Sequence, residues 1–204
     1  MSESPRLGAR QRPAQQAARR ESLLDSLIAL FLEDGFRGLS VDDMAAWAHC
    51  SKRTIYTLGE SKEQVVLTVV RAFFRRATEW IERNLDRGAD PTRQIGSYLL
   101  LISQALAPAS PQFFADLDEF APAREIYDQN TRAAAAQVQQ LVRGAAEPMS
   151  RKDAEFIGTV AGIVMNAIHR KEVAEATGMD DADAYRALAR LIVAGVRGSR
   201  PATS

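Results

Sequence analysis

Apolar residues recur at three- and four-residue spacing along nearly the whole chain, a pattern typical of amphipathic α-helices. The clearest early example is the set Leu23, Leu24, Leu27, Ile28 and Phe31. No stretch alternates apolar and polar residues as a half-buried β-strand does, and no sequence repeat is visible. With 204 residues, the chain is long enough to bury a full hydrophobic core. We therefore expect an all-α fold of about nine helices.

Helix boundaries follow from capping residues and helix breakers. Ser40, Ser51 and Ser61 each stand where a helix needs an N-cap, and Gly35 follows the first helix as a stop signal. The later breaks are "APASP", "FAPA", "EPMS" and "TGMDD". The expected helices cover about 14–34, a short segment after 40, 52–58, 61 to the break at 88–91, 92–107, 111–119, 123–146, 150–176 and 181–197.

Composition excludes several classes of protein. One cysteine cannot form a disulfide framework. A zinc site needs three or four ligands, and His169 lies far along the chain from His49 and Cys50, so we expect no metal and no cofactor. The longest apolar run, at 156–168, is too short to cross a bilayer, and no signal peptide is visible. We expect a cytoplasmic protein without membrane contact. The chain has no nucleophile motif, glycine-rich phosphate loop or His–carboxylate cluster, which argues against an enzyme.

The stretch "VDDMAAWAHCSKRTIY" predicts two short helices separated by about three residues, between two longer helices. This arrangement is typical of a helix-turn-helix. Small residues at Ala45, Ala46 and Ala48 would let the two helices cross closely. His49 stands at the turn, where the chain needs a residue that tolerates a left-handed conformation. Cys50 then fills the place of a small buried hydrophobe rather than of a metal ligand or redox centre.

The second of these short helices presents a polar face, while Ile55 and Leu58 point inward. Its lysine and arginine can reach phosphates or guanine edges, a threonine can contact a thymine methyl group, and a tyrosine can reach a phosphate oxygen. The same face would also suit a solvated surface helix, but the close crossing and the flanking helices favour DNA. The candidate residues on this face are Lys52, Arg53, Thr54, Tyr56 and Thr57.

The first twenty residues form a basic arm. Between Arg6 and Arg20 there are five arginines and no acidic residue, although the whole chain balances 26 basic against 26 acidic side chains. The arm is either a solvated terminus or a nucleic-acid contact.

The segment "LLDSLIALFLEDGFRGLSVDDMAAWAHCSKRTIYTLGESKEQVV" resembles the N-terminal domain of TetR-type transcriptional regulators, aligning without gaps from about residue 20 to 66. The resemblance implies a helix-turn-helix DNA-binding domain at 1–64, with the arm at 1–20 and the motif at about 40–60. It also implies a helical effector-binding and dimerisation domain at 65–204. The expected function is a ligand-responsive repressor that binds a palindromic double-stranded DNA operator as a homodimer, with an unidentified small-molecule effector.

The resemblance also assigns roles to single residues. It implies that Tyr56 and Lys62 touch phosphates, that Ser40 caps the preceding helix beside a phosphate, and that Lys52 begins the recognition helix. The full set of expected DNA-binding residues is Ser40, Ser51, Lys52, Arg53, Thr54, Tyr56, Thr57 and Lys62.

Three residues depart from the family pattern. His49 replaces the usual turn glycine, Leu58 the usual histidine or tyrosine, and Gly59 the usual phenylalanine. We expect Leu58 to remove one phosphate contact and Gly59 to remove an aromatic side chain from the junction with the fourth helix. The last two are the only support for an alternative, a helical interaction protein whose DNA-reading helix is degenerate.

Two further surfaces are expected in the C-terminal part. A single helix-turn-helix reads one half-site, so dimerisation is expected, and the resemblance places the interface on the last two long helices. Its candidate residues are Phe156, Val160, Ile163, Val164, Ala167, Tyr185, Leu188, Ile192 and Val196. Candidate effector-pocket residues, chosen as aromatic residues between 94 and 143, are Tyr98, Phe113, Phe114, Phe120 and Tyr127. Either set would also serve as ordinary core.

Overall fold

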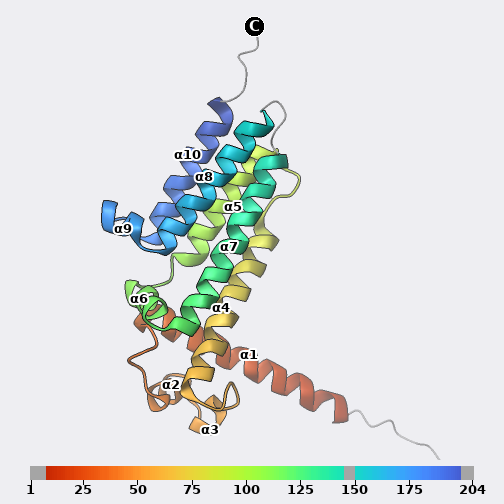
Figure 1. The fold of residues 1–204 in the computed structure, drawn as a ribbon. Helices are drawn as coiled ribbons and strands as arrows, with labels where there is room; N and C mark the ends of the chain where they lie inside the picture. Colours follow the sequence, from red (N-terminus) through yellow and green to blue (C-terminus); the bar gives the residue numbers. More distant parts are fainter. Residues whose placement is uncertain (1–7, 145–149, 199–204) are drawn as a thin grey trace, which may run out of the picture.

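The computed structural model describes residues 8–144 and 150–198, apart from the side chains of 8–14, 92, 151, 154 and 196–198. Within these residues it contains ten α-helices and no strand (Figure 1). The all-α prediction is therefore confirmed. The helices are α1 (Gly8–Asp34), α2 (Val41–Trp47), α3 (Lys52–Ile55), α4 (Lys62–Asn84), α5 (Pro91–Leu106), α6 (Pro111–Glu119), α7 (Ala121–Gly144), α8 (Arg151–His169), α9 (Glu172–Thr177) and α10 (Asp181–Gly198).

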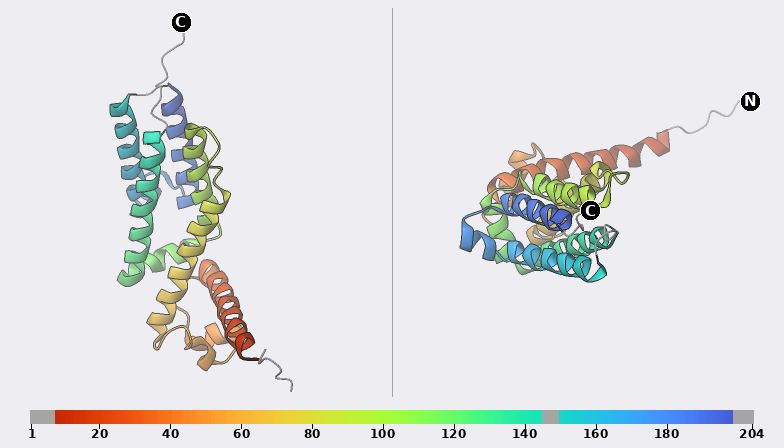
Figure 2. Two further views of the ribbon diagram at one scale, coloured as in Figure 1. Left: turned by 90° about the vertical axis from the view of Figure 1, so that its right-hand side faces the viewer. Right: turned by 90° about the horizontal axis from the view of Figure 1, so that it is seen from above.

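The helices form a small group at one end of the molecule and a longer bundle at the other (Figures 1 and 2). Helices α1, α2 and α3 gather around the first turns of α4 at one end. Helix α4 then runs on into a bundle with α5, α7, α8 and α10, in which α5 packs along α10 and α7 along α8. Because α4 belongs to both ends, it joins them mechanically.

Serine side chains begin the short helices as expected. Ser40 Oγ accepts from Asp43 N, Ser51 Oγ from Thr54 N, and Ser61 Oγ from Gln64 N. At α2, Asp43 also accepts from the backbone N–H of Ser40, which completes a capping box. These local hydrogen bonds explain why the N-termini of α2, α3 and α4 were predictable.

Three helices differ from their expected extent. The helix expected at 150–176 is divided into α8 and α9, because Lys171 takes a left-handed conformation with φ of 65°. Helix α3 ends at Ile55 instead of residue 58, because the chain tightens into i→i+3 hydrogen bonds such as that from Leu58 N to Ile55 O. Helix α1 begins at Gly8, so part of the basic arm is helical. Residues 145 and 146 of the helix expected at 123–146, and Arg6 with the arm's first residues, lie outside the described residues.

Aromatic rings link the two ends of the molecule. They run from α1 through α4 and α6 to α7, with neighbouring centroids 4.9 to 6.0 Å apart. The rings are those of Phe31, Phe36, Phe73, Phe74, Phe113, Phe114 and Tyr127. Within the described part of the chain, no helix has the combination of length and apolarity needed to span a membrane.

Candidate nucleic-acid interface and central cavity

The turn between α2 and α3 has the geometry predicted from its sequence. His49 has a φ of 48°, in the left-handed region, and the backbone N–H of Cys50 returns to Ala45 O at 2.9 Å. Ala45 is buried and Ala48 half-buried, but Ala46 faces solvent, so the expectation of a small residue at the crossing is wrong for Ala46.

Cys50 is a free, half-buried thiol beside this turn. Burial raises the pKa of the thiol, which keeps it protonated and weakly nucleophilic. Among the described residues, no group of three or more histidine, cysteine or acidic side chains is placed to hold a metal ion.

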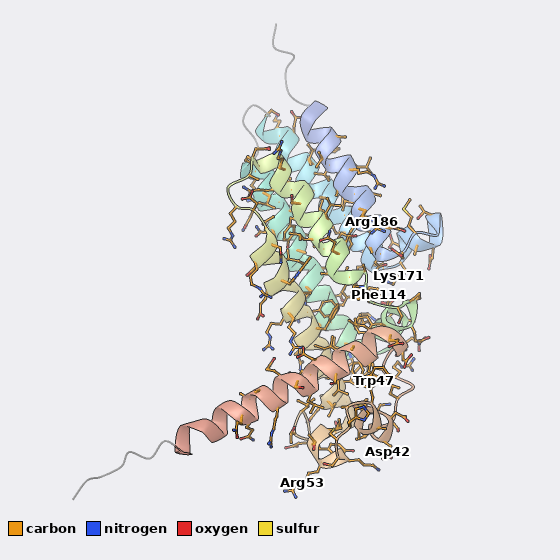
Figure 3. All side chains as sticks on the ribbon, turned by 180° about the vertical axis from the view of Figure 1, so that it is seen from behind. Asp42, Trp47, Arg53, Phe114, Lys171 and Arg186 are labelled. Atoms are coloured by element: carbon orange, nitrogen blue, oxygen red, sulfur yellow. The ribbon has the colours of Figure 1, made fainter. Side chains whose placement is uncertain are left out.

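Residues 52–58, which comprise α3 and the turn after it, are held by two buried side chains and present their polar ones to solvent. Ile55 is fully buried and Leu58 is 5% exposed, whereas Tyr56 is 45% exposed. Lys52, Arg53, Thr54 and Thr57 are exposed as well. Arg53 extends from the tip of this end of the molecule (Figure 3). The two anchors fix the direction of the exposed side chains, as the sequence predicted.

The cations near α3 differ in how strongly they are held. Lys52 Nζ pairs with Asp42 Oδ1 at 2.8 Å, and this contact raises the pKa of Lys52. Lys62 Nζ donates to Arg37 O at 2.8 Å, across to the loop between α1 and α2. Arg53 has no hydrogen bond or ion pair with any other described residue. Its guanidinium is therefore the most available donor group on this surface.

Hydroxyl groups of the candidate set are used within the motif. Ser51 Oγ lies 2.9 Å from Thr54 Oγ1, and Thr57 Oγ1 donates to Thr54 O at 2.6 Å. Ser40 Oγ donates to Asp43 Oδ2 at 2.7 Å. Arg20, at the end of the basic arm, reaches Thr57 O at 3.2 Å. The hydroxyls thus shape α2 and α3, and the arm touches the same surface.

The two unusual residues after α3 are accommodated by packing. Leu58 is buried, and its carbonyl accepts from Thr68 Oγ1 on α4 at 2.9 Å. Gly59 lies so close to α4 that a Cβ there would meet Gln64 Cβ at 2.6 Å and the Gln64 carbonyl carbon at 2.7 Å. The backbone itself closes the junction that an aromatic side chain was expected to fill.

A central cavity of roughly 600 Å³ lies among α4, α5, α7 and α10. Tyr98 and Tyr127 line it. The other three candidate pocket residues do not: Phe113 and Phe114 are buried in the ring cluster between α4, α6 and α7, and Phe120 packs against Phe36. Sequence periodicity cannot separate core rings from cavity rings, because both lie on the apolar face of a helix.

The expected interface residues fall into two groups. On α8, Phe156 is 69% and Ile163 62% exposed, and Val160, Val164 and Ala167 are half-buried. On α10 the expectation is wrong for three residues, which are buried inside the chain because that face of α10 packs on α5: Tyr185, Leu188 and Ile192. The side chain of Val196 lies outside the described residues.

The exposed apolar residue of α10 is instead Leu191, at 69%. The small pair Gly158 and Gly162 faces α7, where a Cβ on Gly158 would lie 3.2 Å from Gln139 Cγ. This pair therefore serves contact within the chain.

A buried polar cluster was not visible in the sequence. Asp181, with a side chain only 4% exposed, binds Lys171 Nζ at 2.8 Å and accepts from the Tyr127 hydroxyl at 2.9 Å. Lys171 Nζ also lies 4.0 Å from the centre of the Phe114 ring (Figure 3). Buried His169 packs edge-on against the Tyr127 ring, with the ring centroids 4.2 Å apart, and pairs with Asp128.

The chain was compared with known proteins by sequence. No protein-family model matches it. An HTH-type transcriptional repressor, DhaR of Mycobacterium sp. (strain GP1), is 32% identical over 88 residues, which cover 43% of this chain. The match spans 44% of that repressor, less than half of its length.

Solved structures match over nearly the full chain. A TetR transcription regulator from Haloarcula marismortui has a TM-score of 0.66 at 12% identity, covering 90% of this chain and 98% of its own. A putative regulator from Saccharomonospora viridis, in complex with choline, scores 0.65 at 16% identity, covering 87% and 96%. A TetR-like regulator from Rhodococcus sp. RHA1 scores 0.59 at 20% identity, covering 89% and 97%. With its helix-turn-helix at one end and its helical bundle at the other, the chain has the fold of the TetR family of transcriptional regulators, as the resemblance of its N-terminal sequence predicted.

Proposed function

We propose that the chain is a transcriptional regulator, acting in the cytoplasm as a repressor, that binds a palindromic operator as a homodimer and leaves it when a small molecule binds. Residues 1–64 would form the DNA-binding domain and 65–204 the effector-binding and dimerisation domain. The observation that carries the proposal is the surface of α3, where buried Ile55 and Leu58 hold a group of exposed polar side chains in fixed directions.

The contacts expected with DNA follow from the availability of each group. Arg53 has an unengaged guanidinium, whose fork of donors suits a guanine edge or a phosphate. Tyr56 can offer its hydroxyl to a phosphate. Lys52 and Lys62 would add phosphate contacts, although each now has a partner in the protein. Ser40, Ser51, Thr54 and Thr57 complete the proposed set, with hydroxyls that also hold the motif together.

The exposed apolar residues support a homodimer. Phe156 and Ile163 lie seven residues apart on α8, hence on one face, and Leu191 lies on the neighbouring helix α10. Exposed large apolar side chains on two helices that contact each other are typical of a protein interface. Two subunits paired through this face would present two α3 surfaces, as a two-fold symmetric operator requires.

The cavity supports a response to a small molecule. It is lined partly by α4, the helix whose first turns pack with the DNA-binding end. A ligand that binds one arrangement of α4 better than another would shift the population of the two and change the separation of the α3 surfaces. One structural neighbour is described in complex with choline, which supports a small-molecule site in this fold.

The test is duplex DNA binding by fluorescence anisotropy at several salt concentrations. Affinity should fall steeply with salt, and Lys62→Ala should reduce the slope by about one phosphate contact. Arg53→Ala should weaken binding, while Lys152→Ala, an exposed cation on α8, should leave it unchanged. Equal effects of the two substitutions would contradict the proposal. Salt-independent or absent binding would favour the alternative of an interaction protein, which the four-residue length of α3 also fits.

Dimerisation is tested separately by sedimentation. The unaltered chain should sediment as a dimer, and Ile163→Asp should produce a folded monomer. A monomeric unaltered chain would refute this part of the proposal.

A further inference from the structure

We propose that the central cavity binds an uncharged, largely apolar molecule whose oxygen acceptor is held by the hydroxyl groups of Tyr98 and Tyr185. The inference rests on the proposed function, because it specifies the chemistry of the effector. It is carried by three features of the cavity wall: its apolar surface, the position of its charges and the state of its polar groups.

Most of the wall is hydrocarbon. The lining residues come from α4, α5, α7 and α10 and from the segment after α4, and Figure 1 shows these four helices running together in the bundle. The apolar lining residues are Phe74, Ala77, Ile81, Leu85, Ile102, Ala105, Leu106, Ala133, Ala134 and Leu141. Such a surface favours a ligand that is itself mostly apolar.

Charge is confined to the outer part of the lining. Glu82 and Arg87 are the charged side chains among the described lining residues, and both are exposed. The buried carboxylate of Asp181 lies behind the wall and is already paired with Lys171. A ligand charge placed deep in the cavity would lose its hydration without gaining a counter-charge, and this makes its burial unfavourable. The part of the ligand that enters must therefore be uncharged.

Several polar groups of the wall are already bonded within the protein. The Gln94 amide donates to Arg87 O at 3.0 Å and to Ala89 O at 2.7 Å. The Asn130 amide donates to Ile126 O at 2.8 Å, and the Tyr127 hydroxyl donates to Asp181. These groups shape the wall and have less capacity for a ligand.

The polar groups that remain include the hydroxyls of Tyr98, Tyr185 and Thr131, and Thr131 Oγ1 is buried without a hydrogen-bond partner among the described residues. Tyr98 on α5 is half-buried and Tyr185 on α10 is 2% exposed, yet neither hydroxyl has a hydrogen-bond partner among the described residues. A tyrosine hydroxyl that lines the cavity without a partner in the protein is free to donate to a ligand acceptor. Both phenols line the same cavity, Tyr98 from α5 and Tyr185 from α10, and these two helices pack along each other. Tyr98 and Tyr185 thus offer two hydroxyl donors to a ligand, in a wall that also carries other polar side chains.

Both phenols act as donors at neutral pH. Burial, with a smaller contribution from Glu82, raises the pKa of Tyr98 to about 12. Burial, Asp181 and Tyr98 raise the pKa of Tyr185 well above its ordinary value. Each hydroxyl therefore keeps its proton, and the ligand group that completes it is an acceptor such as a ketone or ester oxygen.

The experiment compares ligands of similar chain length on the full chain by calorimetry and thermal melting: 2-undecanone, undecane, undecanoate and decyltrimethylammonium. We expect 2-undecanone to bind and to raise Tm, and the anion and the cation to bind much more weakly. Tyr98→Phe and Tyr185→Phe should each lower the affinity for the ketone by roughly threefold to tenfold, the usual contribution of one hydrogen bond. Ser97→Ala, which removes an exposed hydroxyl of α5 that is not among the lining residues, is the control and should have no effect.

Three results would overturn the inference. They are tighter binding of either ion than of the ketone, unchanged ketone affinity in both tyrosine variants while their ligand-free Tm is preserved, and no binding of the ketone at its solubility limit. None of these measurements involves DNA, so the inference and the proposed DNA-binding function fail independently.

Discussion

The buried carboxylate of Asp116 on α6 accepts a hydrogen bond from the backbone N–H of Arg37, at 2.8 Å, in the loop between α1 and α2. The same oxygen accepts from the backbone N–H of Phe36 at 2.5 Å, and Gln112 donates to the other oxygen at 2.7 Å. Nearby, Ser110 N donates to Leu32 O at 2.8 Å. One acidic side chain thus ties the bundle to the end that carries α3.

Replacing this carboxylate should loosen that connection. Asp116→Ala leaves the backbone N–H of Phe36 without its partner in a buried position, so we expect a loss of about 1–3 kcal/mol in the free energy of unfolding. Amide exchange should accelerate at Phe36 and Arg37. Glu119→Ala, which removes only an exposed ion pair with Arg37, should cost less than about 1 kcal/mol and serves as the control. Equal losses in the two variants would contradict the role given to Asp116.

The close approach at Gly59 predicts a clear difference between two glycines. Gly59→Ala places a Cβ within 2.8 Å of the backbone of α4, and we expect about 1–3 kcal/mol of destabilisation in urea unfolding. Gly38→Ala has no atom within 4 Å of the new Cβ and should be neutral or slightly stabilising. A tolerated alanine at Gly59 would show that the junction between α3 and α4 is looser than described.

The left-handed conformation of His49 makes its replacement depend on backbone freedom. His49→Gly should preserve or raise stability, because glycine adopts a φ of 48° without a steric penalty. His49→Val should lower the free energy of unfolding by about 1–2 kcal/mol, because a β-branched residue is strained there. The measurement is urea unfolding of both variants, and the opposite order would mean that the imidazole itself stabilises the turn.

The ion pair between Asp42 and Lys52 predicts that replacing Asp42 will increase the affinity for duplex DNA. If Lys52 contacts a phosphate, Asp42 competes for the same ammonium group at 2.8 Å. Asp42→Ala should then raise affinity for duplex DNA, by roughly twofold to fivefold, and steepen its salt dependence. Asp183→Ala removes a comparable exposed pair with Arg186 on α10 and should not change DNA binding. A loss of affinity in the Asp42 variant would indicate that the pair positions Lys52 instead.

The hydrogen bond between Glu21 on α1 and Arg76 on α4 predicts part of the loss of folding stability at low pH. Arg76 Nη2 donates to Glu21 Oε2 at 2.7 Å, and this hydrogen bond lowers the pKa of Glu21. A carboxylate whose pKa is lowered in the folded state stabilises the fold fully at pH values above its ordinary pKa of about 4.3. This contribution is lost as the pH falls through the lower pKa of the folded state. Glu21→Gln should therefore reduce stability at pH 7 and show a smaller decrease from pH 7 to pH 3. Glu33→Gln, exposed on the same helix, is the control, and identical pH profiles for Glu21→Gln and the unaltered chain would disprove the assignment.

The fold and the surface of α3 were predictable because local interactions determine them. A capping serine bonds a backbone N–H three residues away, and the backbone conformation at His49 depends on its immediate turn. Burial of Ile55 and Leu58 follows from their spacing on one short element. The division of the helix expected at 150–176 was missed, because Lys171 is an unusual residue for a left-handed turn and its partner Asp181 lies beyond α9.

The sequence by itself determined where the helices of the helix-turn-helix end begin and which side chains of residues 52–58 are exposed, since these depend on neighbours within a few residues. Only the tertiary structure decided which apolar face of α10 is buried, which aromatic residues line the cavity, and that Asp116 joins α6 to the loop after α1. All three depend on how helices far apart in the sequence cross, and the apolar spacing of a single helix does not specify which neighbour its face meets.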